Sequence, residues 1–286
     1  MRELLTLLRP HQYIKNLFIF APMLFAFSFT QINFLYALIA FALFSLAASA
    51  IYILNDYMDV EEDRKHPNKK NRPLASEAIS MQSANFLFLL LGATALIGAY
   101  LFSKELAGVL FVYIALNILY SIKLKHIAIV DIFIISTGFV LRLFAGAVAT
   151  QTPLSMWIIL ITFLLAIFLA LAKRRDDVLL SLQGRETRKN IDGYNLEFVN
   201  AAMVLMSGVV IVSYLQYTVS PEVIGRIGSE YLYLSTFFVL LGILRYMQIT
   251  FVEQTSGSPT KIVLKDRFLQ ITILLWIASF IGIAKL

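Results

Sequence analysis

The stretch ILNDYMDVEEDRKHPNKKNRP, residues 53–73, joins the end of a long apolar run to the most highly charged part of the chain. Five acidic residues fall within 56–63, and five basic residues within 64–72. If the run is a helix that continues to residue 63, about a third of its circumference carries Asn55, Asp56, Asp59, Glu62 and Asp63. Carboxylates at this spacing repel one another unless a cation lies between them. The stretch therefore predicts a cation site at the end of an apolar helix.

The rest of the chain is too apolar for a water-soluble domain. Its 286 residues are 59% hydrophobic and 15% charged, with a mean hydropathy of +0.78, whereas a soluble domain carries about 25% charged residues. A bilayer-spanning helix needs about 20 apolar residues, and nine segments approach that length. They lie at 14–30, 33–54, 83–102, 105–121, 127–149, 153–172, 197–219, 231–251 and 268–285. We expect an all-α integral membrane protein whose nine transmembrane helices form a single domain over residues 1–286.

The distribution of lysine and arginine indicates how these helices cross the membrane. With the N-terminus in the cytoplasm, 19 of the 24 basic residues face inward and only Lys104, Arg226 and Lys285 face outward. Arg142 and Arg245 lie within predicted spans. Because cytoplasmic loops are enriched in lysine and arginine, we expect a multi-pass protein of the cytoplasmic (inner) membrane. Its active site is expected at the cytoplasmic face, where the charged loops meet.

The chemistry of the acidic stretch favours magnesium. Asn55, Asp59 and Asp63 recur at a spacing of four and are the predicted metal ligands, with Asp56 beside them. Oxygen ligands without histidine or cysteine suit Mg²⁺, which binds through a few carboxylates and substrate phosphates. The chain has no cysteine, which excludes a cysteine nucleophile or a thiolate site. A solvated acidic turn at the membrane surface is the alternative.

A second charged cluster, LALAKRRDDVLLSLQGRETRKNIDGYN, spans residues 169–195 and is expected to form a loop after the sixth helix. It contains six basic residues among four acidic ones. Arginine grips phosphate through two hydrogen bonds and lysine binds it as a point charge. The cluster therefore predicts a phosphate site, and an anchor for anionic lipid headgroups is the alternative.

These motifs together resemble the UbiA superfamily of intramembrane prenyltransferases, through Asn55-x₃-Asp59-x₃-Asp63 at the end of the second helix. The family's usual second Asp-x₃-Asp is altered here, because Lys173 stands where the first aspartate is expected and Asp177 where the second is. The chain is similar to the decaprenyl-phosphate phosphoribosyltransferase branch in six segments. They are LRPHQYIKNLFIFAP (8–22), NDYMDVEEDRKHPNKKNRPLAS (55–76), YSIKLKHIAIVDIFIISTGFVLRLFAGAVA (120–149), LAKRRDDVLL (171–180), TRKNIDGYN (187–195) and SPTKIVLKDRFLQ (258–270).

The resemblance implies transfer of the 5-phosphoribosyl group from 5-phosphoribosyl 1-diphosphate to a polyprenyl monophosphate, with release of diphosphate. In the actinobacterial members the product leads to the D-arabinose donor for cell-wall polysaccharide. On this basis Asn55, Asp56, Asp59 and Asp63 are the catalytic residues, with Mg²⁺ on the donor diphosphate. The expected substrate-binding residues are Lys15, Tyr120, Lys125, Arg142, Lys173, Arg174, Asp177, Arg188, Lys189 and Tyr194.

Two other function classes remain open at this stage. A UbiA-type aromatic prenyltransferase would bind a polyprenyl diphosphate and no ribose. A transporter for an anionic solute would be expected to have helices broken near the middle of the membrane, whereas only Pro22 lies inside a predicted span. The expected partners are the two substrates and the lipid bilayer, without nucleic acid, and the sequence is compatible with a homo-oligomer.

Overall fold

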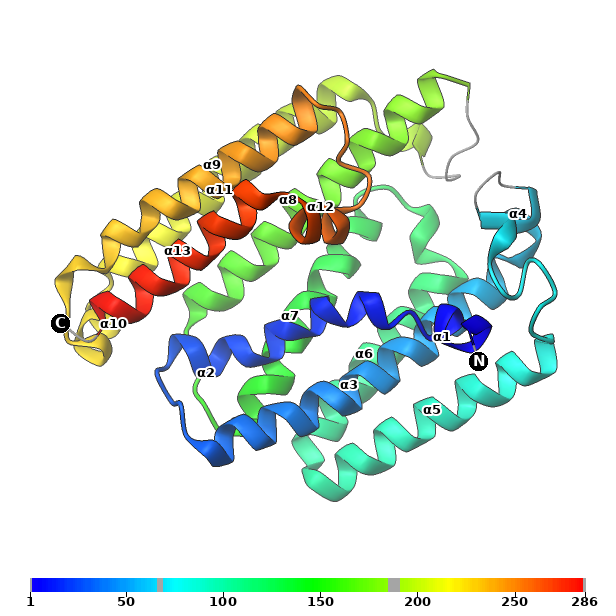
Figure 1. Ribbon diagram of the computed structural model, residues 1–286, viewed down its shortest axis with the longest axis horizontal. Helices are drawn as coiled ribbons and strands as arrows, with labels where there is room; N and C mark the ends of the chain where they lie inside the picture. Colours follow the sequence, from blue (N-terminus) through cyan, green and yellow to red (C-terminus); the bar gives the residue numbers. More distant parts are fainter. Residues whose placement is uncertain (1, 66–68, 185–190, 285–286) are drawn as a thin grey trace. The chain divides into compact units, whose positions relative to one another are not determined.

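The computed structural model describes residues 2–65, 69–184 and 191–284, and this part of the chain is helical without a β-strand. The chain divides into two compact units, Met1–Leu154 and Ser155–Leu286. We call them unit 1 and unit 2 and describe each by itself. The helices of both units are labelled in Figure 1.

Unit 1 contains the acidic stretch and is built around α3. Its elements are α1 (Arg2–Leu8), η1 (Pro10–Phe20), α2 (Ala21–Phe25), α3 (Gln31–Met58), α4 (Val60–Lys65), η2 (Lys69–Asn71), α5 (Met81–Phe102), α6 (Lys104–Ile122), η3 (Leu124–His126) and α7 (Val130–Thr150). The long helices begin where the sequence supplies a cap. Thr30, Ser80 and Ser103 each accept a hydrogen bond from the N–H group three residues later, which starts α3, α5 and α6.

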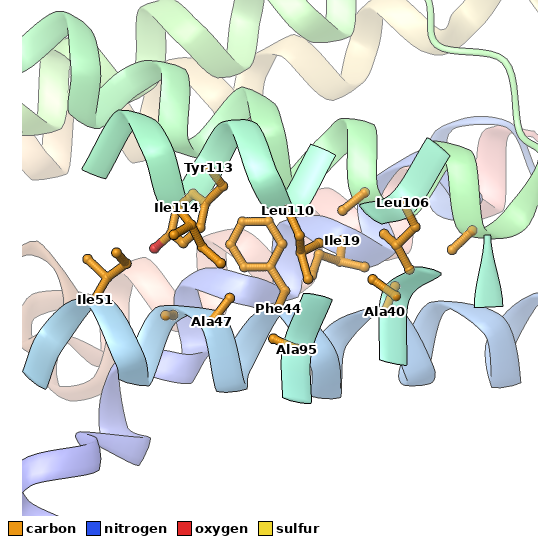
Figure 2. Packing of buried hydrophobic residues seen from close by; sticks show 14 residues of the cluster. Ile19, Ala40, Phe44, Ala47, Ile51, Ala95, Leu106, Leu110, Tyr113 and Ile114 are labelled. Atoms are coloured by element: carbon orange, nitrogen blue, oxygen red, sulfur yellow. The ribbon is translucent and has the colours of Figure 1, made fainter. Parts of the chain in front are cut away.

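The buried face of α3 holds unit 1 together (Figure 2). This face is rich in alanine, including Ala40 and Ala47, and it packs against α5 at Ala95 and Ala99. Phe44 lies between these small residues and meets Tyr113 of α6, with the ring centroids 4.4 Å apart. In a membrane protein lipid tails are as apolar as leucine, so close packing of small residues is what favours helix association.

The segment predicted as the first span, 14–30, does not form one regular α-helix. It forms the 3₁₀ segment η1, then the short α2 and a turn before α3. Pro10 and Pro22 stand at the first turns of η1 and α2, where a missing N–H is tolerated. Gly146 lets η1 lie directly against α7, because a Cβ atom built there would fall 1.9 Å from the carbonyl oxygen of Ile19.

Unit 2 contains the second charged cluster. Its elements are α8 (Met156–Leu182), η4 (Ile191–Gly193), α9 (Leu196–Val219), α10 (Pro221–Ile227), η5 (Glu230–Ser235), α11 (Thr236–Phe251), α12 (Pro259–Lys265) and α13 (Arg267–Ile283). Ser155 and Asn195 cap α8 and α9. The prediction that the cluster forms a loop is wrong for its first part, because α8 continues to Leu182 and includes Lys173–Asp177.

Seven helical segments in the described residues are long and apolar enough to cross a membrane. They are Gln31–Met58, Met81–Phe102, Lys104–Ile122, Val130–Thr150, Met156–Leu182, Leu196–Val219 and Glu230–Phe251. The pair α12 and α13 is bent by 82° and would make an eighth span if it crosses as one. These seven or eight candidate spans match eight of the predicted segments in position, and the remaining segment is the one that forms η1 and α2.

Candidate functional site

The acidic motif lies where α3 ends and α4 begins. Asp59 is the last residue of the α3 turn, and its backbone leaves the helical region (φ −98°, ψ 6°). The hydrogen bonds from Asp59 N to Asn55 O (3.0 Å) and from Asp63 N to Asp59 O (2.8 Å) preserve the four-residue spacing across this break. The predicted continuous helix is therefore interrupted once, and the acidic side chains divide into two groups.

The first group is Asp56 and Asp63, which Arg72 brings together. Arg72 Nη1 donates to Asp56 Oδ1 at 3.0 Å and to Asp63 Oδ2 at 2.6 Å. Arg9 also pairs with Asp56, and Lys69 Nζ lies 4.0 Å from Asp63 Oδ1. Both aspartates are only 2% exposed. Two buried carboxylates are thus held beside three cations, an arrangement that neutralises them without a ligand.

The second group is Asn55 and Asp59, which face α6 and η3. Lys125 pairs with Asp59, and Ser121 Oγ donates to Asn55 Oδ1 at 2.7 Å. Tyr120, the neighbour of Ser121, is buried in the same turn of α6. The predicted residues Asn55, Asp59, Tyr120 and Lys125 therefore lie at one end of unit 1, together with Asp56 and Asp63.

Burial changes the acidity of Asp63, which lies outside the candidate spans. Loss of solvent raises the pKa of this carboxyl group, and the nearby Asp56 acts in the same direction. Arg72 and Lys69 oppose the increase but do not cancel it. Asp63 therefore carries its negative charge at a cost, and a further cation would relieve that cost.

The oxygen ligands of this cluster fit magnesium that arrives with a phosphate. Within the described ranges, no three histidine, cysteine or acidic side chains are grouped as a metal cage. Mg²⁺ does not need such a cage, since it usually keeps several waters and binds through one or two carboxylates plus substrate phosphates. Asp59 and Asp63, with Asn55 beside them, offer suitable hard oxygen atoms. Arg72 and Lys125 occupy the carboxylates in the ligand-free chain.

Two further predicted residues lie deeper in unit 1. Arg142, in α7, is buried, and its Nε donates to Asn16 Oδ1 of η1 at 2.7 Å. Lys15 precedes Asn16, and its charge interacts with those of Arg142 and Arg9. Arg9 in turn lies over the ring of Tyr52, one turn before Asp56 on α3. This connects the deeper cations to the acidic cluster.

The predicted residues of unit 2 are separated by their contacts. Arg174 is 1% exposed, and its Nη1 donates to Asp177 Oδ2 at 2.7 Å. Arg175 instead links three helices: its Nε donates to Asn200 Oδ1 at 2.8 Å and its Nη1 to the carbonyl of Thr250 at 2.7 Å. Lys173 is half-buried in the same turn of α8. Much of the positive charge in this turn is therefore engaged in contacts within unit 2.

Tyr194 lines a small groove at the end of α8. The groove has a volume of about 250 Å³ and is also lined by Val178, Ser181 and Asp192. The tyrosine is buried and packs against Phe198, with ring centroids 6.2 Å apart. The predicted residues Arg188 and Lys189 lie outside the described residues.

Sequence reasoning did not single out Arg9, Arg72 or Ser121 as site residues. Arg72 was visible only as one of five bases after the acidic stretch, and nothing in its spacing pointed to Asp56 and Asp63. Arg9 is 47 residues from Asp56 in sequence. Its left-handed backbone (φ 54°) before Pro10 is a feature of the fold that composition does not reveal.

Comparison with known proteins now adds to this geometry. The profile of the UbiA prenyltransferase family matches residues 16–272. The chain belongs to the UbiA prenyltransferase family. The match covers the acidic motif of unit 1 and most of unit 2, so both units are parts of a UbiA protein. With its apolar helices, this membership makes the chain a multi-pass membrane protein.

Two named relatives align with nearly the whole chain. The decaprenyl-phosphate phosphoribosyltransferase of Mycobacterium tuberculosis is 34% identical over 278 residues, which cover 95% of this chain and 91% of that protein. The protein of the same name from Mycolicibacterium smegmatis is 35% identical over 289 residues, covering 96% and 90%.

A solved structure has the same fold. It is a UbiA homolog from Archaeoglobus fulgidus bound to GPP and Mg²⁺, with a TM-score of 0.72 and 17% sequence identity. The alignment covers 99% of this chain and 100% of that one. The all-helical fold predicted from the sequence is therefore confirmed as UbiA-like.

Proposed function

We propose that this UbiA protein transfers the 5-phosphoribosyl group from 5-phosphoribosyl 1-diphosphate to a polyprenyl monophosphate, with release of diphosphate. The observation that carries the proposal is the alignment, over about nine-tenths of each chain, with relatives named decaprenyl-phosphate phosphoribosyltransferase. The altered second motif agrees with it, because a protein that binds prenyl diphosphate through two acidic motifs has no need of Lys173 in the second. Aromatic prenyl transfer remains the competing function for the assay.

The cluster of unit 1 supports this chemistry through its mixture of charges. The sugar donor carries a diphosphate and a separate phosphate, so it requires carboxylates for a metal and cations for direct contacts. Asp56, Asp59 and Asp63 alternate with Arg9, Arg72 and Lys125 at one end of the unit. The remaining proposed contacts are Lys15, Tyr120, Arg142, Lys173, Arg174, Asp177, Arg188, Lys189 and Tyr194.

In the proposed reaction, an oxygen of the lipid phosphate forms a bond to C1 of the ribose. The bond between C1 and the diphosphate oxygen breaks, and the diphosphate leaves with the electron pair. The nucleophile is already an anion, so no residue has to remove a proton. Mg²⁺ held by Asn55, Asp59 and Asp63 would neutralise the charge of the departing diphosphate. Arg72 and Lys125 can then turn from the carboxylates to phosphate oxygens.

We also propose the setting of the site. Nine membrane crossings, counting η1 with α2 as the first, would place the N-terminus and the acidic cluster in the cytoplasm. In this arrangement the two units form one UbiA domain in the inner membrane. The excess of lysine and arginine in the loops of one side supports this orientation. Oligomeric assembly is compatible with it.

A transfer assay on purified protein tests the proposal. The protein in detergent receives Mg²⁺, 5-phosphoribosyl 1-diphosphate labelled in the ribose, and a polyprenyl monophosphate. Label should appear in the organic extract and disappear with EDTA. A parallel reaction contains a prenyl diphosphate and 4-hydroxybenzoate. Prenylated benzoate without labelled lipid would refute the phosphoribosyl proposal.

Two matched variants separate the metal site from general charge effects. Asp59→Asn should lower transfer by about two orders of magnitude or more, because it removes a charge that stabilises the departing group. Glu61→Gln changes a nearby carboxylate that is 74% exposed and pairs with Arg64. It should retain nearly full activity. Equal activity in the two variants would contradict the role of Asp59.

A further inference from the structure

Two cations of unit 1 are buried without an acidic partner. Arg142 is 5% exposed, and its hydrogen bonds to Asn16 Oδ1 and to the carbonyl of Gly138, both 2.7 Å long, reach neutral oxygens. Lys15 makes no hydrogen bond or ion pair within the described residues. A buried charge is costly unless it is paired, and a cation inside a membrane span is a strong indication of a functional site.

The nearest acidic residue does not provide the missing charge. Lys15 interacts with the charges of Arg142 and Arg9, and Arg9 is paired with Asp56. Asp56 is already shared with Arg72. Three neighbouring cations, Lys15, Arg9 and Arg142, therefore depend on one carboxylate that a fourth cation also contacts. The deeper part of the cluster has an excess of positive charge.

The guanidinium of Arg142 is held in a fixed position. It lies over the rings of Phe44, Tyr113 and Phe139 at 4.8, 5.3 and 5.4 Å. Asn16, its hydrogen-bond partner, is itself fixed by a 2.9 Å bond from Nδ2 to Ser45 Oγ. The rings and the amide orient the cation and partly stabilise it. Neither supplies a negative charge, so the site is organised in advance for an anion.

The place of these cations separates them from the metal cluster. Phe44, on which Arg142 stacks, precedes Asp56 by twelve residues of α3, about 18 Å of helix. Lys15 connects the two levels through its interactions with Arg9 and Arg142. A diphosphate with its metal suits the carboxylates, whereas a phosphate monoester binds lysine and arginine directly.

We propose that Lys15 and Arg142 form a second anion site, which binds a phosphate monoester of one of the two substrates. This inference rests on the proposed function, whose donor and acceptor each carry one such group. The donor has it at the 5 position of the ribose, and the acceptor has it at the head of the polyprenyl chain. Asn16 is a positioning residue that aims Arg142 at this group.

Thermal unfolding of the purified full chain tests the site with two probes, ribose 5-phosphate and farnesyl phosphate. At least one probe should raise the Tm of the unmodified protein and of Lys104→Met, which changes an exposed lysine at the start of α6. Lys15→Met should weaken binding of the same probe by about tenfold or more, the usual effect of losing a charged hydrogen bond. The probe that loses its effect identifies the substrate that uses the site.

A second variant keeps the test independent of folding defects. Asn16→Asp gives Arg142 a carboxylate partner at its existing hydrogen-bond position. It should retain or raise the Tm without ligand and abolish the shift caused by the probe. A full shift in Lys15→Met or Asn16→Asp, or no shift with either probe in the unmodified protein, would overturn the site. Probe binding without any transfer activity would instead refute the proposed reaction and leave the site supported.

Discussion

At the scale of single residues, Arg72 explains how the acidic motif persists without a ligand. One nitrogen of its guanidinium contacts both Asp56 and Asp63, and Arg9 completes the local balance of charge. A Mg²⁺ ion alone would add two positive charges to a cluster that is already balanced. A metal that enters with its diphosphate avoids this, because the phosphates give Arg72 a new acceptor. We therefore expect metal and donor to bind together.

Asp63 allows a prediction about pH. Its pKa is raised by burial, so the folded chain favours the protonated form more than the unfolded chain does. The resulting stabilisation is present below the unfolded pKa of about 4 and is lost as pH rises through the folded pKa. Asp63→Asn should therefore unfold at the same or a higher temperature than the unmodified chain at neutral pH without Mg²⁺, while losing transfer activity. The difference in Tm should shrink as the pH is lowered.

The control for this prediction is Glu61→Gln, because its carboxylate is exposed and bound to Arg64. Its Tm should follow that of the unmodified chain at every pH. A lower Tm for Asp63→Asn at neutral pH would mean that the ion pair with Arg72 outweighs the cost of burying the charge.

The sequence predicts the identity of the acidic ligands better than their partners. The spacing of Asn55, Asp59 and Asp63 follows from helix geometry alone, and the hydrogen bonds of the backbone preserve it. The pairing of Asp59 with Lys125 and of Asp56 with Arg9 joins residues 66 and 47 positions apart. Such contacts depend on how helices pack, which periodicity within one helix does not describe.

At the scale of elements, η1 is positioned by a single glycine of α7. Gly146→Ala should destabilise the protein by about 1–3 kcal/mol, the usual cost of overpacking, because the new Cβ would meet the backbone of Ile19 at 1.9 Å. The same displacement would move Lys15 and Asn16, so transfer activity should fall as well. Thermal unfolding and the transfer assay measure the two effects.

Gly108→Ala is the matched control on α6, since nothing lies within 4 Å of the added Cβ. It should be neutral or slightly stabilising, because alanine is the better helix former. If both variants unfolded at the same temperature, the close contact between η1 and α7 would not support the structure of unit 1.

A comparable contact organises the charged end of α8 in unit 2. The loop after α11 is fixed to α8 by a 2.9 Å hydrogen bond from Ser256 Oγ to the carbonyl of Ala172. A Cβ atom at Gly257 would lie 2.1 Å from Asp176 Oδ2. Gly257→Ala should therefore push Asp176 aside and reduce transfer activity, with a loss of stability of about 1 kcal/mol, since the side chain can rotate.

Gly242→Ala on α11 is the control for this contact, because its added Cβ would meet Thr272 at an ordinary 3.7 Å. Full activity in Gly257→Ala would show that the position of Asp176 does not matter for transfer. The importance of this loop could not be predicted from the sequence, where Lys173–Asp177 appears as an exposed basic cluster. The buried contacts of Arg174 and Arg175 emerge only when α8 meets its neighbours.

At the scale of the whole molecule, hydropathy is sufficient to predict the helices and insufficient to describe the first segment. Long apolar runs must be helical in lipid because their backbone groups have no other partners, and this accounts for α3, α5 to α9, and α11. Residues 14–30 meet the same criterion of composition. They form a 3₁₀ segment and a short helix because two prolines and the contact at Gly146 determine their path.

The orientation of the molecule gives the last prediction. Because the chain has no cysteine, single cysteines can be introduced and labelled without background. Lys70→Cys lies beside the acidic cluster, and Lys104→Cys lies in a segment predicted to face outward; both positions are exposed. In intact cells a membrane-impermeant maleimide should label Lys104→Cys and leave Lys70→Cys unlabelled until the membrane is opened. The reverse pattern would place the acidic cluster outside the cell, away from a soluble phosphorylated sugar made in the cytoplasm, and would refute the proposed topology.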